Sequence, residues 1–353
     1  MRSRPLVLAV TLATLLLAAC GTSQESGPEP PAPTGTRADG PRSDGARLVY
    51  RGEGRASAQN PAFSPDGRRM LFTLFHGGYN EGAAALRVVP FDGRAASPQE
   101  PRADTLLDES DRAAVNLPGA SWHPSAGVAF ASDRAGRDEV WVLPPGGGRP
   151  VRVTEHRGKS GYLEPSFSPD GEWIVFQESV EEETGNEERR PSRAALGSLW
   201  KVRRDGRGAT RLLDGPATGT DNRQPNWSPK GDRLVFQRRE RGGDTWALYV
   251  MNADGTGLRR LTDGSGEHTD PSWSPDGRSV VFSSTAGGLE VPQIFVIPAA
   301  GGAPVRVTRN PGGYDGAPSW SPDGRWIAFE AHPGDEDRPT ALWRIPAPGA
   351  VTR

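Results

Sequence analysis

The sequence has 353 residues, of which 45 are Gly and 34 are Pro, and only 7% are aromatic. This abundance of turn-forming residues favours many short strands joined by tight turns and argues against a helical protein. A formal net charge of −2 argues against a nucleic-acid partner, and a single cysteine, Cys20, excludes an intramolecular disulfide.

The N-terminus has the pattern of an export signal. Two arginines in the first four residues precede an apolar run over residues 6–19, which is too short to span a membrane as a helix. The run ends in Leu17-Ala18-Ala19-Cys20-Gly21, which resembles a bacterial lipobox. The resemblance implies that residues 1–20 are a lipoprotein signal peptide and that Cys20 is lipidated. An ordinary signal cleaved near Ala19, which leaves a free thiol, is the alternative.

Residues 21–45 are a mixture of Ser, Pro, Gly and Glu without apolar periodicity. Such a segment cannot bury enough apolar surface to offset its ordering entropy, so we expect a disordered tether. The membrane would then be contacted through the lipid anchor only. The residue after the cysteine is Gly21, whereas an aspartate there resembles an inner-membrane retention signal. We therefore expect an exported lipoprotein on the periplasmic side of the outer membrane rather than at the inner membrane or the cell surface.

One phrase recurs through the rest of the chain. Its clearest copy is Pro318-Ser319-Trp320-Ser321-Pro322-Asp323-Gly324, in which Pro322 is the turn proline. Similar copies, which we call intact, start at Pro61, Pro165, Pro225 and Pro271, and a degenerate copy, called the worn copy, lies around Trp122. Seven residues after each turn proline stands a phenylalanine: Phe72, Phe176, Phe236, Phe282 and Phe329. Repeats at tens of residues indicate an array or a propeller. The worn copy keeps the pattern with one residue deleted, so that Phe130 follows Pro124 by six.

Each repeat contains enough strand signals for four short antiparallel strands, which is the content of a propeller blade. The phrase and the strands after it resemble the WD40-like (PD40) repeat of TolB-type proteins. The resemblance covers residues 46–353 and implies an all-β, six-bladed β-propeller. The last repeat lacks a full fourth strand, whereas Arg47-Leu48-Val49-Tyr50 resembles a fourth strand without a blade of its own. We therefore predict that this N-terminal strand pairs into the last blade and closes the ring.

The Ser-Pro-Asp-Gly core of the phrase has the composition of a turn. Its aspartates resemble a carboxylate constellation, but Lys230 takes the same position in the fourth of the six copies, the one that starts at Pro225. A position that accepts either charge favours a turn role over a catalytic one.

The variable loops all fall on one face of the expected propeller, and we place the binding site there, at the mouth of the central channel. The residues predicted to ring the mouth stand just before the first strand of each repeat, directly before the repeat proline, or lie close upstream: Asn60, Tyr162, Glu164, Asp221, Gln224, His268, Asp270, Tyr314 and Asp315, with Ala317 as the apolar member. The alternative is that these residues only satisfy backbone groups and solvate the channel. The charged loop over residues 178–197 is expected to be solvated, and a partner-facing arm is its alternative.

The sequence contains no G-x-S-x-G, H-E-x-x-H, G-x-x-x-x-G-K or C-x-x-C motif. We therefore expect no catalysis, cofactor or metal. The favoured hypothesis is a monomeric, membrane-anchored binding or scaffold protein of the cell envelope, which engages a protein or peptidoglycan-linked partner. The alternative is a metal-dependent lyase or hydrolase acting on polysaccharide at the channel mouth, since some TolB-like propellers resemble metal-containing sugar lyases.

Overall fold

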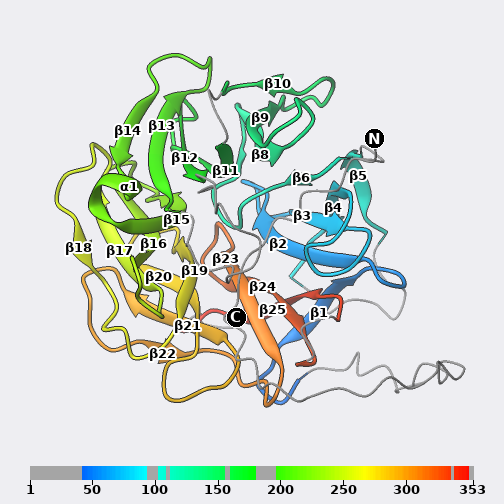
Figure 1. Ribbon diagram of the computed structural model, residues 1–353. Coiled ribbons are helices and arrows are strands. Elements are labelled where there is room, and N and C mark those ends of the chain that lie inside the picture. The colour runs from blue at the N-terminus through cyan, green and yellow to red at the C-terminus, as the bar shows by residue number, and fades with distance from the viewer. Residues whose placement is uncertain are drawn as a thin grey trace, which may run out of the picture.

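The computed structural model describes residues 42–93, 102–108, 112–155, 160–179, 196–334 and 338–349. Six antiparallel sheets follow one another around a central axis, and the chain colour runs around this ring until its first and last strands meet (Figure 1). The prediction of a six-bladed propeller is confirmed. Cys20 and nearly all of the loop at 178–197 lie outside the described residues.

Blades 1 to 3 cover the first half of the propeller. Blade 1 consists of β2 Ser57–Phe63, β3 Arg69–Phe75, β4 Ala84–Pro90 and β5 Asp104–Leu107. Blade 2 consists of β6 Ala114–Val115, β7 Trp122–His123, β8 Gly127–Ser132, β9 Glu139–Leu143 and β10 Val151–Arg152. Blade 3 consists of β11 Gly161–Phe167, β12 Trp173–Ser179, β13 Ser198–Arg203 and β14 Thr210–Leu213. In blade 2 the innermost position is divided between β6 and β7, which both pair with β8.

Blades 4 to 6 complete the ring after the short helix α1 Gly215–Thr218. Blade 4 consists of β15 Thr220–Trp227, β16 Arg233–Glu240, β17 Ala247–Asn252 and β18 Arg259–Arg260. Blade 5 consists of β19 His268–Trp273, β20 Ser279–Ser284, β21 Gln293–Pro298 and β22 Val305–Arg306. Blade 6 consists of β23 Tyr314–Trp320, β24 Trp326–His332, β25 Ala341–Pro346 and β1 Arg47–Arg51.

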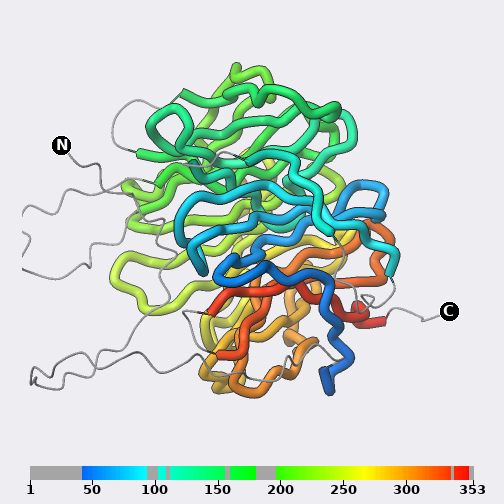
Figure 2. The backbone as a smooth tube through the Cα atoms, turned by 90° about the vertical axis from the view of Figure 1, so that its right-hand side faces the viewer, coloured from blue at the N-terminus to red at the C-terminus, as the bar shows by residue number. Residues whose placement is uncertain are grey.

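The N-terminal strand closes the ring as predicted. β1 pairs antiparallel with β25, with Arg47 opposite Arg344 and Leu48 opposite Trp343. In the side view the blue N-terminal strand runs beside the red C-terminal one (Figure 2). Because β1 continues directly toward β2, the first and last blades are joined by both hydrogen bonds and chain connectivity.

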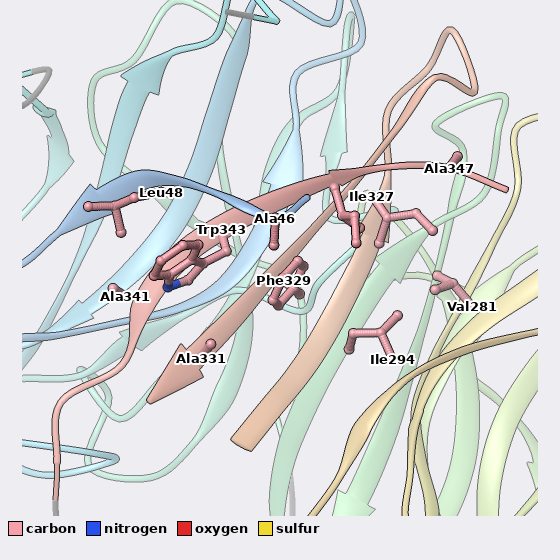
Figure 3. Packing of buried hydrophobic residues seen from close by; sticks show 11 residues of the cluster. Ala46, Leu48, Val281, Ile294, Ile327, Phe329, Ala331, Ala341, Trp343 and Ala347 are labelled. Atoms are coloured by element: carbon pink, nitrogen blue, oxygen red, sulfur yellow. The ribbon is translucent and has the colours of Figure 1, made fainter. Parts of the chain in front are cut away.

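The hydrophobic core lies between the blades. Six clusters of buried side chains occupy the six blade boundaries, and each combines residues of two neighbouring sheets. The repeat phenylalanines are all fully buried: Phe72, Phe130, Phe176, Phe236, Phe282 and Phe329. Figure 3 shows the cluster between blades 5 and 6, where Ala46 and Leu48 pack near Trp343 and Phe329.

The repeated turns also pack against one another. In four of the five intact turns the glycine lies against the turn proline of the preceding blade, as Gly231 does against Pro169 and Gly277 against Pro229. In blade 2, His123 occupies the place of that proline and contacts Gly171. These turns therefore form one face of the propeller, here called the turn face, and the variable loops form the opposite, loop face. No helix in the described part of the chain is long and apolar enough to cross a bilayer.

Candidate functional site at the loop face of the channel

The innermost strand of each intact blade is interrupted at one residue, directly before the repeat proline. There the pairing register shifts and the backbone adopts a positive φ of 46–55°. These five residues, which we call the channel ring, are Asn60, Glu164, Gln224, Asp270 and Ala317. They were predicted to stand just before the first strands, but they lie within them as bulges. A bulge re-aims a side chain, and a positive φ in a residue other than glycine persists only where surrounding contacts enforce it.

Those contacts are hydrogen bonds between neighbouring blades. The Asn60 N–H donates to Glu330 Oε2 of blade 6 over 2.9 Å, and the Gln224 N–H donates to Glu164 Oε2 of blade 3 over 2.6 Å. The Asp270 N–H is shared between Gln224 Oε1 at 2.9 Å and Gln237 Oε1 at 3.0 Å. The ring side chains therefore satisfy backbone donors of the following blade, which was the structural alternative considered for these residues.

The same contacts place carboxyl groups in a poorly solvated acidic environment. Burial raises the pKa of Glu330 to about 8, and the nearby charge of Asp270 adds to this effect. Burial also raises the pKa of Glu164 to about 7, although Arg223 and the Gln224 N–H oppose the shift. Both carboxyl groups therefore hold a proton for part of the time near neutral pH.

Two tyrosines stand next to Glu330. The Tyr314 hydroxyl donates to Glu330 Oε1 over 3.3 Å, and the Tyr79 hydroxyl lies 3.4 Å from the same oxygen. Tyr79 comes from the β3–β4 loop of blade 1, and its ring meets those of Tyr314 and His332 edge to face. Sequence reasoning missed Glu330 and Tyr79, because neither precedes a repeat proline. The channel ring with Glu330, Tyr79 and Tyr314 is the candidate site.

The worn copy of the repeat runs across the inside of the ring below this site. Asn116 Nδ2 donates to the Asn60 carbonyl of blade 1 over 2.7 Å, and the Phe167 N–H of blade 3 donates to the Ala120 carbonyl over 2.8 Å. A Cβ on Gly119 would lie 2.7 Å from Ser272 Oγ of blade 5. The Ala120 N–H also donates to Asn226 Oδ1 of blade 4 over 3.4 Å. A segment that touches four other blades crosses the inside of the ring. Because Ser272 follows its repeat proline, the segment lies on the turn-face side of the channel ring.

Four other residues predicted at the mouth have different surroundings. Tyr162 packs edge to face on Phe176 at the boundary of blades 2 and 3. Buried His268 lies against Phe282, with Nδ1 2.9 Å from Ser284 Oγ, and burial lowers its pKa to about 4.

Asp315 is fully buried and binds Arg42 over 2.7 and 2.8 Å. Asp221 accepts the Gly197 N–H over 2.9 Å and pairs with Arg223 over 2.8 Å. Tyr162, His268 and Asp315 therefore belong to blade boundaries rather than to the mouth, since their position in the strand turns them toward a neighbouring blade. Within the described ranges, no three His, Cys, Asp or Glu side chains converge as metal ligands.

Comparison with known proteins identifies the architecture. The TolB beta propeller domain (PD40) matches residues 216–339. The described chain is a TolB-like six-bladed β-propeller. The TolB homologue of Chlorobium luteolum is 32% identical over 134 residues, which are 38% of this chain and 26% of the relative. The match thus spans about a quarter of the curated relative's length.

Two solved structures share the fold. TolB from Acinetobacter baumannii has a TM-score of 0.52 and 17% identity, over 85% of this chain and 65% of that chain. An oligogalacturonate lyase from Vibrio parahaemolyticus has a TM-score of 0.54 and 11% identity, over 87% of this chain and 94% of that chain. A TolB protein and a lyase share the architecture, so the fold alone does not assign a function to this chain.

Proposed function

We propose that this propeller is a non-catalytic binding protein of the cell envelope that engages a protein or peptidoglycan-linked partner at the loop face of its channel. The observation that carries the proposal is the hydrogen bonding of the channel ring. The carboxylate and amide oxygens of Glu164, Gln224 and Glu330 accept backbone N–H groups of neighbouring blades. These hydrogen bonds hold the acidic residues of the channel mouth in fixed positions, and Tyr79 and Tyr314 add aromatic rings of the kind that protein recognition uses.

The proposed setting follows from the N-terminal sequence. Cys20 anchors the chain by its lipid to the periplasmic side of the outer membrane, and the tether lets the propeller sample the space beside the membrane. Each buried methylene of an acyl chain contributes about 0.8 kcal/mol, so several chains hold the protein durably. The variant Cys20→Ser should move the protein from the membrane fraction to the soluble fraction and abolish incorporation of labelled palmitate. Unchanged fractionation would contradict the anchor.

The binding site is tested by site-specific photo-crosslinking in an envelope extract. A photoreactive residue replaces Tyr79 at the candidate site, and a matched control replaces Lys230 on the turn face. The proposal expects one dominant protein or peptidoglycan fragment, captured from position 79 and absent from position 230. Equal capture at both positions, or capture at neither, contradicts it. Cleavage of a polysaccharide that requires added Mn²⁺ or Ca²⁺ would instead establish the lyase alternative.

A further inference from the structure

Three blades place a phenylalanine and a tryptophan opposite each other on their second and third strands. The pairs are Phe130 with Trp141 in blade 2, Phe176 with Trp200 in blade 3, and Phe329 with Trp343 in blade 6. In two of them an arginine guanidinium lies over both rings. Arg134 is 4.9 Å from each ring of the blade 2 pair, and Arg42 is 5.5 Å from each ring of the blade 6 pair.

Arg42 reaches its pair from the segment before β1, which fills the boundary between blades 5 and 6. Its guanidinium binds Asp315 over 2.7 and 2.8 Å and Asp44 over 2.6 Å. Asp44 also accepts the Arg309 N–H, over 2.7 Å, and Gly45, at φ 87°, donates its N–H to the Arg42 carbonyl over 2.9 Å. In the segment Arg42-Ser43-Asp44-Gly45, the arginine binds Asp315, the aspartate accepts the Arg309 N–H, and the glycine forms the turn between them.

The boundary between blades 2 and 3 is built in the same way but holds an open groove of about 340 Å³. The two boundaries share one threonine contact: Thr154 Oγ1 accepts the Val140 N–H over 2.9 Å, as Thr308 Oγ1 accepts the Ile294 N–H over 2.9 Å. They differ at the position of Asp315, which Tyr162 takes in the groove. The groove is lined by Arg152, Val153, Thr154, Glu155, Tyr162, Phe176, Trp200, Val202, Gly206 and Ala209. Arg152 and Glu155 pair with each other over 3.1 Å. Among the described residues no guanidinium lies over Phe176, and Arg211 lies 5.6 Å from the Trp200 ring.

The electrostatics of this groove favour a cation. Glu178 accepts the Trp200 Nε1–H over 2.7 Å, so a carboxylate stands beside the aromatic pair. A second carboxylate, Glu139, is buried and accepts the Thr154 hydroxyl over 2.5 Å. Burial together with these two charges raises the pKa of Tyr162 to about 12. A guanidinium over Phe176 and Trp200 would thus meet both aromatic faces and negative charge.

We propose that this groove receives the segment Arg37-Ala38-Asp39-Gly40 of a second copy of the chain, with Arg37 stacked on Phe176 and Trp200. The segment repeats the Arg-x-Asp-Gly pattern of residues 42–45 only five residues earlier. The same pattern at residues 203–206 forms a turn with the same bond, Gly206 N–H to the Arg203 carbonyl over 2.8 Å. Pro41 lacks the N–H that Ala46 donates to Asp44, so one hydrogen bond of the counterpart is missing.

The occupant comes from another copy because the chain's own segment cannot reach. The two boundaries lie on opposite sides of the ring (Figure 1). Residues 37–41 span at most about 18 Å when extended. A path between the boundaries crosses the channel and a row of strands on each side, about 14 Å per four-stranded blade.

A single short motif binds weakly, and chains held on one membrane by the proposed lipid anchor would meet at a raised effective concentration. The groove contact itself does not depend on that anchor or on the channel site. Association in solution therefore fails or succeeds separately from the photo-crosslinking at position 79.

The test is sedimentation equilibrium of the full chain in detergent, with a donor variant, Arg37→Ala, and an acceptor variant, Glu178→Gln. The parent chain should show a weight-average mass that rises with concentration, and each variant alone should associate about tenfold more weakly. An equal mixture of the two variants should recover association, because one copy supplies Arg37 and the other supplies the groove. Arg278→Ala and Glu290→Gln remove exposed charges elsewhere and should behave as the parent.

A peptide of residues 33–41 provides the second measurement. It should perturb Trp200 fluorescence in the parent chain and suppress association, whereas the peptide with Arg37→Ala should do neither. A mass that stays monomeric at every concentration overturns the proposal, as does association that survives in both variants. Arginine-dependent peptide binding by a strictly monomeric chain would also reject the second copy as occupant and would assign the groove to an arginine segment of another protein.

Discussion

At the scale of single residues, serine and aspartate side chains fix the repeated turns through hydrogen bonds. In four turns the serine hydroxyl donates to the aspartate two residues later over 2.5–2.6 Å, and it accepts the N–H five residues on. In the turn with Lys230 the role of the aspartate passes to Asp232, which accepts the Ser228 hydroxyl over 2.7 Å. The sequence predicted the turn role of these aspartates correctly, but not this replacement.

Asp232→Ala should therefore lower the free energy of unfolding by about 1 kcal/mol, because the Ser228 hydroxyl loses its acceptor. Adding Lys230→Asp restores the common Ser-Pro-Asp-Gly arrangement and should recover most of the loss. Urea denaturation of the two variants measures the difference, and Lys230→Ala alone should stay within about 0.5 kcal/mol of the parent. A double variant no more stable than Asp232→Ala would show that the two aspartate positions are not interchangeable.

The raised pKa of Glu330 predicts a pH-dependent stability. Between the ordinary value of 4.5 and about 8, folded Glu330 keeps a proton that the unfolded chain has lost. The stability gained from this proton is complete below about pH 4.5 and is lost as the pH rises through about 8. Glu330→Gln keeps an acceptor for the Asn60 N–H without the ionisation. It should raise the free energy of unfolding at pH 9 by on the order of 1–3 kcal/mol relative to the parent.

This difference should shrink as the pH falls to 5. Thermal unfolding of the parent and of Glu330→Gln at both pH values checks the sign. Glu290→Gln, at an exposed position, should leave the pH profile of the parent unchanged. A benefit of Glu330→Gln that is equal at pH 5 and pH 9 would contradict a buried ionisation.

At the scale of elements, the segment before β1 belongs to the propeller rather than to the tether. Residues 21–45 read as a polar tether, yet Arg42 and Asp44 fix this segment against blades 5 and 6. No local pattern reveals this, because the partner Asp315 lies 273 residues away. For the same reason Glu330 and Tyr79 escaped prediction: they reach the channel ring only once the blades are assembled. The ring residues themselves were predictable, since their spacing from the repeat proline is local.

Arg42→Ala should be strongly destabilising, because it leaves the carboxylate of Asp315 buried without its cation. Breaking one partner of a buried ion pair typically costs about 3–5 kcal/mol. Arg42→Ala combined with Asp315→Asn removes the unpaired charge and should recover a large part of this loss. Chemical denaturation of both variants measures the recovery. A double variant less stable than Arg42→Ala would mean that Asp315 is stabilised without Arg42.

At the scale of the whole molecule, stability depends on closure of the ring. The hydrophobic core consists of six clusters between blades, so each blade needs a neighbour on both sides. The sequence predicted this architecture because turn chemistry, strand alternation and repeat spacing agree in six copies. It could not predict that residues 116–120 cross the inside of the ring, since this segment acquires its role from contacts with blades 1, 3, 4 and 5.

Removal of residues 42–51 should therefore destabilise the propeller far more than the removal of ten exposed surface residues would. It deletes the outer strand of blade 6, exposes the edge of β25 and withdraws Leu48 and Val49 from two boundary clusters, so that blades 1 and 6 lose their covalent and hydrogen-bonded link. We expect the melting temperature to fall by about 10 °C or more and the single unfolding transition to broaden. Deletion of residues 22–36 is the matched control, because it removes tether sequence and should leave melting unchanged. Calorimetry of the two deletions distinguishes the effects. Equal melting temperatures would show that the six blades hold together without the N-terminal strand. A lower melting temperature only for the deletion of residues 42–51 would make β1 the element on which the closed ring depends.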